Sequence, residues 1–350
     1  MKKKAYASAG VDIDLGNRVK SGLPAMLAST RRSGVMGKVG GFGGLFALDT
    51  TRYKKPVLVS SVDGVGTKLK VAFAAGRHDT IGQDLVNHCV NDIAVLGAEA
   101  LFFLDYLGTG KLEPKVFEAI IAGFAKACAE NRCALIGGET AQMPGFYQSG
   151  EYDVSGTIVG VVEKSRMLTG KGIRAGDRVL GLEGNGLHTN GYSLARKVLL
   201  EQMKLKLNSR VPDLGRTLAE ELLRVHRSYG VFVQKLVSKF NPIDGKAGVK
   251  GIAHITGGGF VDNIPRILPK NCDVVIRKGS WPVQPVFQLI QRGGKIDESE
   301  MYQVFNMGIG MVIVVAGEQA DRIQKHARAA GENVFLIGEV VRGKGVVELV

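Results

Sequence analysis

Apolar runs typical of β-strands alternate with segments of helical periodicity along the first half of the chain. The run from Val57 to Val62 is apolar and β-branched, which predicts a strand. Segment 79–96 has apolar residues at helical spacing, including Ile81, Leu85 and Cys89, which predicts a helix. The alternation continues with expected strands at 101–107, 133–136 and 154–162, and with a helix at 114–131 that has a proline at its start.

The second half repeats this alternation after a polar segment at 163–177. We expect strands at 178–182, 251–255, 308–315 and 334–340, a helix from Tyr192, helical turns across 214–240, and helices at 260–268 and 318–330. With 350 residues the chain exceeds the roughly 250–300 at which one core stops growing. The pattern therefore predicts an α/β (α+β) protein of two domains, residues 1–168 and 169–350.

Glycine is unusually frequent and gathers in short clusters. The chain has 48 glycines in 350 residues, about twice the usual share of about 7%. Clusters occur at 40–44, 64–66, 137–138 and 257–259. Such clusters indicate backbone that turns tightly or closely approaches a ligand.

Cysteine spacing and hydropathy indicate the cellular compartment of the protein. The four cysteines form no C-x-x-C pair, which favours reduced thiols and a cytosolic setting. No apolar run approaches the roughly 18 residues of a membrane span. The basic start, Lys2 to Lys4, has no apolar segment behind it, so we expect no signal peptide and no membrane partner.

The formal net charge of +13 admits two interpretations. A nucleic-acid interface would need clustered basic residues with interleaved aromatics, but here Lys and Arg are scattered and the chain has one Trp. We therefore expect no nucleic-acid partner. A basic surface that assists the capture of anionic substrates is the favoured interpretation.

The first candidate site follows the strand predicted at 57–62. Asp63, Gly64, Gly66, Thr67 and Lys68 stand together just past its end. In such a turn the acid can bind a metal, the glycines can present backbone N–H groups to phosphate, and the lysine can supply a cation. The alternative is an ordinary Asp-Gly turn with a surface lysine.

The helix predicted at 79–96 has a polar face. Asp84, His88, Asn91 and Asp92 are spaced by four, seven and eight residues, so they share one side of a helix whose other side is apolar. We expect this face to meet water or a ligand, and Asn91 with Asp92 suits magnesium and its water shell. The alternative is a solvated stripe.

A third acid follows the strand predicted at 133–136. Gly137 and Gly138 precede Glu139, so a carboxylate again stands where the backbone can approach a ligand. Asp63, Asp92 and Glu139 together provide the oxygen ligands expected for Mg²⁺-ATP rather than for a thiolate-bound metal.

The glycine-rich segment 40–44 fits neither of two common nucleotide motifs. It lacks the G-x-G-x-x-G spacing of a dinucleotide fold, and the chain contains no Walker A lysine motif. We interpret Gly41, Gly43 and Gly44 as a flap over a triphosphate, with a linker as the alternative.

Two glycine-rich turns in the second half each contain a histidine. Gly186 to Gly191 includes His188, and His254 is followed by Thr256 and three glycines, each ahead of a predicted helix. The N-terminus of a helix with glycines is a favourable place for a sugar phosphate. The two histidines therefore suit acid/base or oxyanion roles, although a loop histidine is often a plain hydrogen-bonding group. The other histidines with no such context, His78, His226 and His326, are interpreted as surface groups.

Taken together, these segments resemble the aminoimidazole ribonucleotide synthetase family, also called phosphoribosylformylglycinamidine cyclo-ligase. The similarity runs nearly from end to end. It rests on segments 9–14 with 16–17, 40–44, 63–68, 77–82, 101–106, 137–141 with 143–145, 188–194, 256–260 with 263–266, and Met301 with 305–306.

The resemblance implies an ATP- and Mg²⁺-dependent cyclisation of formylglycinamidine ribonucleotide in a cytoplasmic homodimer, with mixed sheets packed with helices and a β-barrel across the dimer interface. ATP would phosphorylate the formyl oxygen, and the ribose-bearing nitrogen would then attack the formyl carbon.

The predicted metal ligands are Asp63, Asp92 and Glu139. The predicted cofactor-binding residues are Gly41, Gly43, Gly44, Asp63, Gly64, Gly66, Thr67, Lys68, Asn91 and Glu139. The predicted substrate-binding residues are His188, Thr189, Asn190, Thr256, Gly257, Gly258 and Gly259. The predicted catalytic residues are Asp63, Lys68, His188 and His254.

The chain departs from the family pattern at a few positions. Asn87 and His88 stand where small or apolar residues are usual, and Gln142 replaces an acid. Thr189 replaces the usual serine and keeps the hydroxyl. The change at Gln142 removes one possible carboxylate from the site.

Related families and a non-catalytic scaffold are the alternatives. Selenophosphate synthetase would need a reactive cysteine in the glycine-rich loop, and 37–44 contains none. Thiamine-monophosphate kinase and the hydrogenase-maturation dehydratase share the Asp-Gly-Val-Gly-Thr type of turn, and the preceding amidotransferase has a longer synthetase part. A nucleotide-binding scaffold would be expected to lose acids, and this chain keeps Asp63, Asp92 and Glu139.

Overall fold

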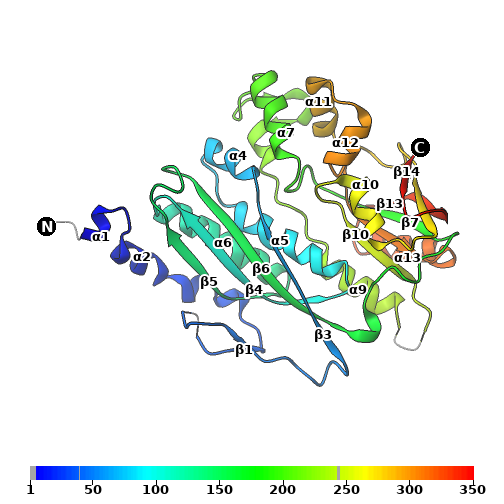
Figure 1. Cartoon of the computed structure of the whole chain (residues 1–350), viewed down its shortest axis with the longest axis horizontal. Coiled ribbons are helices and arrows are strands. Elements are labelled where there is room, and N and C mark those ends of the chain that lie inside the picture. Colours follow the sequence, from blue (N-terminus) through cyan, green and yellow to red (C-terminus); the bar gives the residue numbers. More distant parts are fainter. Residues whose placement is uncertain (1–4, 39, 243–244) are drawn as a thin grey trace.

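Two β-sheets with their helices organise the molecule (Figure 1). The computed structural model describes residues 5–38, 40–242 and 245–350. A four-stranded sheet has the order β3-β6-β4-β5, and a six-stranded sheet has the order β10-β12-β7-β13-β11-β14. The predicted α/β class is therefore confirmed.

The N-terminal sheet is mostly antiparallel and has helices on one face. Its strands are β3 (Pro56–Gly64), β4 (Glu99–Thr109), β5 (Ala134–Gln142) and β6 (Tyr152–Glu163). β4 and β5 are parallel, which requires the crossover helix α6 (Pro114–Glu130) between them. α6 and α5 (Ile81–Ala94) pack over one face, with Phe103 of β4 against Phe124 of α6.

The opposite face of this sheet is largely open. Residues of β3 alternate between exposed and half-buried, and the side chains of Leu58 and Val62 are each 64% exposed. A hairpin of β1 (Val35–Met36) and β2 (Leu45–Phe46) reaches this part of the sheet, with Phe46 5.4 Å from Phe102 between ring centroids.

The C-terminal sheet is more deeply buried. Its strands are β7 (Arg178–Glu183), β10 (Val249–His254), β11 (Cys272–Ile276), β12 (Ile309–Val315), β13 (Val334–Arg342) and β14 (Val347–Leu349). Every residue of β12 is buried, as expected for an apolar strand between two neighbours. The longer helices of this half are α9 (Gly230–Phe240), α11 (Pro285–Gly294), α12 (Glu298–Val304) and α13 (Ala320–Ala329).

The other helices are short. They are α1 (Ala5–Ser8), α2 (Ile13–Lys20), α3 (Leu23–Met26), α4 (Lys68–Ala75), α7 (Tyr192–Arg196), α8 (Leu218–Leu222) and α10 (Gly259–Asn263). α2 begins at an N-cap in which Asp12 accepts from the backbone N–H of Leu15. α1 and α2 project from one end of the molecule (Figure 1).

Most predicted elements are present, and the differences have physical causes. β5 continues to Gln142, past the predicted end at 136, because the glycines at 137–138 still pair with β4. β11, α11 and α12 were not predicted, since their short segments had no periodicity that we recognised. The predicted domain boundary at 168/169 lies between β6 and β7 and remains a prediction.

Two simpler expectations concern thiols and membranes. All four cysteines are buried and unpaired, in agreement with the expectation of reduced thiols. Among the described residues, no helix combines the length and apolar character that a bilayer crossing needs.

Candidate functional site

The polar face of α5 is turned toward the C-terminal half of the chain. There His88 and Asp92 of α5, with Asp63 at the end of β3, meet Thr189, His226 and His254 from the other half. We call these six residues the junction site. The prediction that this face meets water or a ligand was incomplete, because protein groups cover most of it.

A chain of polar contacts links the two acids of the junction site. His88 contacts Asp63 Oδ2 through Nε2 at 2.9 Å and Thr189 Oγ1 through Nδ1 at 2.7 Å. Thr189 Oγ1 lies 3.1 Å from His226 Nδ1. His226 Nε2 lies 3.2 Å from His254 Nε2, and His254 Nδ1 lies 2.8 Å from Asp92. Each histidine ring is thus fixed at both nitrogens.

Asp63 and Asp92 converge on one imidazole. The Asp92 carboxylate also approaches His88 Nε2, at 3.8 Å, and it accepts a hydrogen bond from Ser61 Oγ. Although burial acts to raise both pKa values, hydrogen bonds and charge from His88 and His254 hold the pKa of each acid below its usual range. The Asp63 and Asp92 side chains stay 40% and 25% exposed, so two ionised carboxylates reach solvent side by side.

His226 corrects our interpretation of that residue as a surface group. Its side chain is fully buried, and burial holds its pKa well below the usual value. It stands in an irregular segment between α8 and α9, inside the region 214–240 where helical turns were expected, and no motif marks it. Its role depends on tertiary packing and had no local sequence signal.

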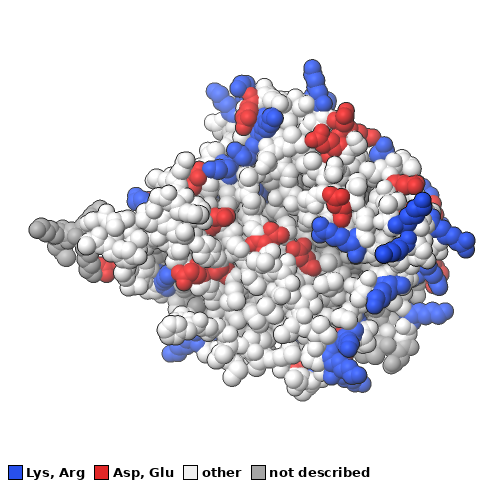
Figure 2. Space-filling view, viewed as in Figure 1, with Lys and Arg blue, Asp and Glu red and all other residues white. Residues whose placement is uncertain are grey.

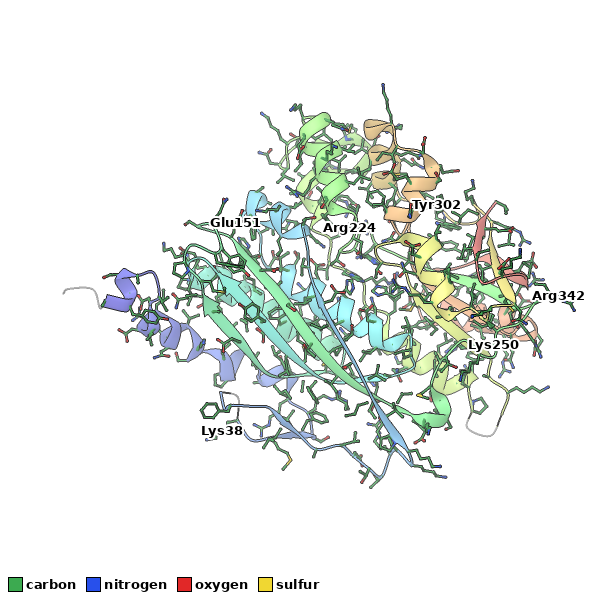
Figure 3. All side chains as sticks on the ribbon, viewed as in Figure 1. Lys38, Glu151, Arg224, Lys250, Tyr302 and Arg342 are labelled. Atoms are coloured by element: carbon green, nitrogen blue, oxygen red, sulfur yellow. The ribbon has the colours of Figure 1, made fainter. Side chains whose placement is uncertain are left out.

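Lys68 corrects a second prediction, that its amine would neutralise phosphate. The ammonium is buried and donates to Asp84 Oδ1 at 2.8 Å, to the His188 carbonyl at 3.1 Å and to the Arg224 carbonyl at 2.6 Å. Arg224 lies where α4 meets the C-terminal half (Figure 3). With three donors and three acceptors in place, Lys68 has no proton free for a ligand.

The Lys68–Asp84 pair joins the two halves of the chain. Asp84 also accepts from the backbone N–H of His226, at 2.7 Å. Burial raises the pKa of Asp84 to about 6 and lowers that of Lys68, although each partner acts in the opposite sense. We interpret the pair as structural, because neither group reaches solvent.

Asn91 also differs from its predicted role in nucleotide binding. Its amide is buried, accepts from the Tyr229 N–H at 2.8 Å and donates to the Arg227 carbonyl at 2.8 Å and to His226 Nε2 at 3.1 Å. These contacts fix segment 226–229 onto α5. The asparagine therefore holds protein and is not available to a cofactor.

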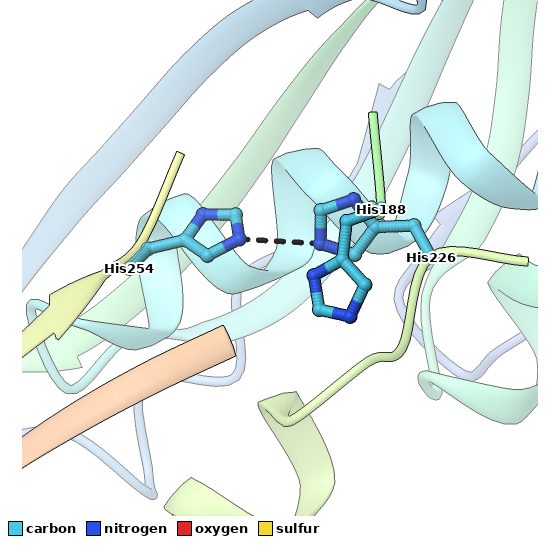
Figure 4. A group of neighbouring side chains, drawn as sticks. All are labelled: His188, His226 and His254. Carbon is cyan, nitrogen blue, oxygen red and sulfur yellow. Dashed lines mark hydrogen bonds between the residues drawn. The ribbon is translucent and has the colours of Figure 1, made fainter. Parts of the chain in front are cut away.

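His188 and His254 are less accessible than the sequence suggested. The His188 ring stacks on His226 at 4.2 Å and is buried, in a left-handed backbone conformation with φ 59°. Burial holds its pKa well below the usual value. His254 is 6% exposed, and both of its ring nitrogens have partners. Both ring nitrogens of His254 have protein partners, one of them His226 (Figure 4), which corrects its prediction as an acid/base group. The buried Nδ1 of His188 has no hydrogen-bond partner among the described residues, so the predicted role of His188 remains a prediction.

The glycine turn after His254 faces Asn190. A side chain at Gly257 would lie 3.4 Å from Asn190 Oδ1, and Asn190 Nδ2 is buried without a hydrogen-bond partner among the described residues. Asn263 holds the turn by donating to the carbonyls of Thr256, Gly257 and Gly259. The predicted substrate residues Asn190, Thr256 and 257–259 therefore lie together, whereas Thr189 belongs to the junction site.

The turn at 64–67 leads into α4, and its residues Gly66 and Thr67 are exposed, whereas Val65 is buried. Gly66 has φ 67°, a conformation that favours glycine. Thr67 precedes the first residue of α4, is exposed, and its hydroxyl lies 3.0 Å from that of Ser193. This turn can present backbone N–H groups beside Asp63.

Glu139 and the glycine-rich loop lie at the far edge of the N-terminal sheet. Glu139 pairs with Tyr106, Tyr106 with Ser155, and Ser155 with Gly64, so three strand spacings, about 14 Å, separate Glu139 from the Asp63 turn. The prediction that Glu139 shares a metal with Asp63 and Asp92 is therefore wrong within one chain. Gly44 contacts Ile136 of β5, and Gly41 and Gly43 are exposed nearby.

A large cavity lies elsewhere in the described part of the chain. It has a volume of about 770 Å³ and lies at the opposite end of β3 and β6 from Asp63, lined by residues that include Arg52, Glu163 and Lys239. No predicted site residue lines it. We give more weight to the junction site, because ionised acids and an accessible glycine turn are the groups that phosphate chemistry needs.

Charge is unevenly spread over the face seen in Figure 2. Acidic side chains run across its middle, and Lys and Arg are mainly toward the upper and right-hand margins. On this face the basic residues form no single central patch, which matches the scattered charge noted in the sequence.

Comparison with known proteins gives consistent matches in both halves. Residues 48–162 match the family model described as AIR synthase related protein, N-terminal domain, and 174–350 match the C-terminal domain of the same name. The chain is 52% identical to the phosphoribosylformylglycinamidine cyclo-ligase of Citrifermentans bemidjiense, over 99% of both chains. It is 50% identical to the protein of that name from Geobacillus thermodenitrificans, over 98% of this chain and 97% of the other.

Solved structures with much lower identity share the fold. Thiamine-monophosphate kinase from Stenotrophomonas maltophilia has a TM-score of 0.66 at 17% identity, covering 97% of this chain and 96% of the other. The hydrogenase maturation protein HypE, solved in complex with ATP, has a TM-score of 0.67 at 19% identity, covering 95% and 90%.

Proposed function

The chain belongs to the phosphoribosylformylglycinamidine cyclo-ligase family, and we propose that the junction site with its neighbouring turns is where the reaction takes place. The reaction is the ATP-dependent cyclisation of formylglycinamidine ribonucleotide to aminoimidazole ribonucleotide, with release of ADP and phosphate, in purine biosynthesis. The chain is therefore a ligase.

The chemistry needs a phosphate-transfer centre beside a sugar-phosphate site. We propose that the formyl oxygen takes the γ-phosphoryl group of ATP and becomes part of a phosphate leaving group. The ribose-bearing nitrogen then attacks the same carbon, which closes the ring and expels phosphate. Catalysis of this kind depends mainly on positioning and on stabilisation of charge.

Asp63 and Asp92 are the proposed ligands for Mg²⁺. Their carboxylates are ionised, converge on the same side of His88 and remain partly exposed, which suits a hard cation that prefers oxygen. When bound, Mg²⁺ neutralises charge on the phosphate oxygens. His254 and His88 orient the two carboxylates, and we assign them as positioning residues.

We propose that the phosphates of ATP bind at the turn at 64–67. The exposed residues Gly66 and Thr67 would present backbone N–H groups at the start of α4, next to Asp63, whereas the Gly64 N–H donates to the Asp63 carboxylate. The helix dipole adds a favourable positive potential at this end. This proposal keeps Gly64, Gly66 and Thr67 in the cofactor set and assigns Lys68 and Asn91 to the framework.

The proposed substrate site is formed by Asn190 and the turn at 256–259. Asn190 Nδ2 is a buried donor without a partner in the part of the chain that the structure describes, and a donor of this kind is costly unless a ligand or water satisfies it. The facing glycine turn lets backbone approach a sugar phosphate closely.

We also propose that the chain acts as a homodimer in the cytoplasm, without a nucleic-acid partner. The open face of the N-terminal sheet exposes Leu58 and Val62, and apolar surface of this kind commonly marks an interface. Two four-stranded sheets facing each other would form the barrel expected from the family. We propose 1–168 and 169–350 as the two domains.

The observation that carries the proposal is the convergence of Asp63 and Asp92 beside an open glycine turn. The test is to incubate purified protein with formylglycinamidine ribonucleotide and Mg-ATP and to follow ADP together with the aminoimidazole product. Equal formation of both is expected. Nucleotide turnover without ring product would assign the chain to a sister activity, and no nucleotide binding would favour a scaffold.

A further inference from the structure

The cavity at the end of β3 and β6 that is remote from Asp63 has a volume of about 770 Å³, within the range of small-molecule sites. We infer that this cavity binds a small polyanion of the oligophosphate class, at a site separate from the junction site. Asp63 lies seven residues along β3 from Pro56, the residue at which the strand begins. This separation corresponds to roughly 23 Å of extended chain, at about 3.3 Å per residue.

Both halves of the chain form the walls of the cavity. The N-terminal half contributes segment 51–54 before β3 and residues of segment 161–166 at the end of β6, and the C-terminal half contributes α9, which lies beside this end of β6 in Figure 1. Gln234 of α9 donates through Nε2 to the carbonyls of Gly97 and Ala98, at 3.1 and 2.7 Å. These hydrogen bonds fix α9 against the turn before β4, so the two walls are held in place by the protein itself.

Cationic side chains outnumber carboxylates in the lining of the cavity. Figure 2 shows Lys and Arg side chains grouped at the lower margin, where β3 begins in Figure 1. The carboxylates of the lining are those of Glu99 and Glu163. The cationic side chains of the lining are Arg52, Lys54, Arg166, Lys235 and Lys239.

Protein groups already occupy both carboxylates. Glu99 pairs with Arg52 at 3.0 Å and also accepts from the Tyr53 hydroxyl. Glu163 accepts from the backbone N–H of Lys54 at 2.8 Å. The other four cationic side chains of the lining have no carboxylate partner in the described part of the chain. Positive charge therefore remains in the cavity, which favours an anionic ligand.

Arg166 adds a donor that the fold leaves unsatisfied. Its Nε is buried and has no hydrogen-bond partner among the described residues, a costly state that an oxygen atom of a ligand or of water would relieve. The planar guanidinium of arginine suits phosphate oxygens in particular. Lys235 of α9 supplies an ammonium group from the other half of the chain. A ligand that contacts both side chains needs several charged oxygens, and an oligophosphate has them.

The cavity offers little to a nucleobase. Tyr53 is the only aromatic residue in its described lining. The Tyr53 hydroxyl donates to Glu99, and the Arg52 guanidinium lies 5.5 Å from the centroid of the Tyr53 ring. Because this ring is already engaged by protein groups, we expect the cavity to recognise the charge of its ligand rather than a base.

The test is to titrate sodium tripolyphosphate into the full-length protein by isothermal titration calorimetry, with EDTA present. Without Mg²⁺ the ionised Asp63 and Asp92 carboxylates repel phosphate from the junction site, so binding reports on the cavity. We expect one tripolyphosphate per chain, with an affinity that falls as the salt concentration rises. ATP should bind no more tightly than tripolyphosphate, and clearly tighter binding of ATP would contradict recognition by charge alone.

Lys235→Gln and Arg166→Gln should each raise the Kd of tripolyphosphate about tenfold or more, because each removes a charged donor to the anion. Lys115→Gln is the matched control, since Lys115 is exposed on α6, lies outside the cavity and loses the same charge. Its Kd should stay within about twofold of that of the parent chain. Lys235 is exposed, so Lys235→Gln keeps the test decisive if Arg166→Gln fails to fold.

The inference is overturned if tripolyphosphate does not bind in EDTA. It is also overturned if Lys235→Gln and Lys115→Gln weaken binding equally, because the attraction would then belong to the net charge of the whole chain. Ring formation by Lys235→Gln should match that of the parent chain, and its loss would place the cavity in the ring-closing reaction instead of at a separate site. The calorimetry needs no turnover, so its result stands even if the parent chain fails the test of ring closure.

Discussion

The junction between the two halves and the outer edge of the N-terminal sheet contain residues that the sequence predicted to act together. At the junction, polar side chains are buried and have partners from both halves of the chain. At the edge, Gly41 and Gly43 are exposed, and Glu139 is 66% exposed and pairs with Lys20 at 4.0 Å.

The difference shows what a motif can and cannot specify. The motif at 63–68 begins with the last two residues of β3, whereas the motif at 137–139 lies inside β5 and not after it as predicted. The distance between the two motifs depends on strand order. Because β5 and β3 are at opposite edges of the sheet, the motif at 137–139 is separated from the motif at 63–68. Burial, rather than the motif, then decides whether a charged group is a ligand or part of the framework.

The largest expected effect is on stability, from Lys68→Met. The change leaves Asp84 buried without its cation, and removal of one partner from such a pair typically costs about 3–5 kcal/mol. Adding Asp84→Asn should restore much of the loss. The measurement is urea unfolding followed by circular dichroism.

Lys70→Met is the matched control for Lys68→Met. Lys70 is on the same helix and pairs with Glu151 at 2.7 Å, but its side chain is 45% exposed, so the expected cost is at most about 1 kcal/mol. Equal losses from the two substitutions would contradict the structural role of the buried pair.

The next largest expected effect is on kcat, which we compare between substitutions of two acids. Asp63→Asn should lower kcat by about 10²- to 10³-fold, since it removes a ligand of the charge-stabilising ion. Glu139→Gln should change kcat little if the site is complete within one chain. Steady-state rates of ADP and product formation measure both variants, with folding checked by circular dichroism.

A large loss of kcat in Glu139→Gln would give a different conclusion. It would mean that the partner chain of a dimer brings this acid to the site, since about 14 Å separates it from the Asp63 turn within one chain. Near-normal turnover in Asp63→Asn would instead contradict the metal role of Asp63.

Predictions from the sequence were most successful where a single helix or turn determines the position of the residue. The face shared by Asp84, His88 and Asp92 follows from helical spacing, and the tight turn at 64–67 follows from its glycines. Both features depend on local geometry, so a single sequence sufficed for them.

The errors occurred where distant segments determine the environment. Lys68 was expected to be free because its carbonyl partners, in residues 188 and 224, have no signature in the sequence. His226 was missed because its neighbours come from α5, and Glu139 was misplaced because strand order was unknown.

A third prediction concerns Asp105 of β4, a carboxyl with no donor from the C-terminal half. No side chain among the described residues pairs with it, and burial raises its pKa to about 7 from an ordinary value of 3.8. The folded state therefore binds more protons than the unfolded state between about pH 4 and 7, so stability falls as pH rises through this window.

Asp105→Asn removes this titration. Relative to the parent chain its free energy of unfolding should rise with pH up to about 7 and then level off. The gain should be about 1–3 kcal/mol, the usual cost of a buried polar group without a partner. Urea unfolding at a series of pH values measures it, and a gain that is constant with pH would contradict the assignment.

The smallest expected effect concerns the open face of the N-terminal sheet. Val62→Glu places a charge on this face, and a two-fold interface would contain that charge twice. The dissociation constant of the dimer should therefore rise at least tenfold, which corresponds to about 1.4 kcal/mol of association free energy.

Leu336→Glu, at a residue that is 41% exposed in the C-terminal sheet, is the control and should not alter association. Sedimentation velocity over a concentration series separates the two. Because Val62 is one residue from Asp63, activity of the Val62→Glu monomer would also reveal whether the junction site needs a partner chain, and an unchanged dimer would exclude this face as the interface.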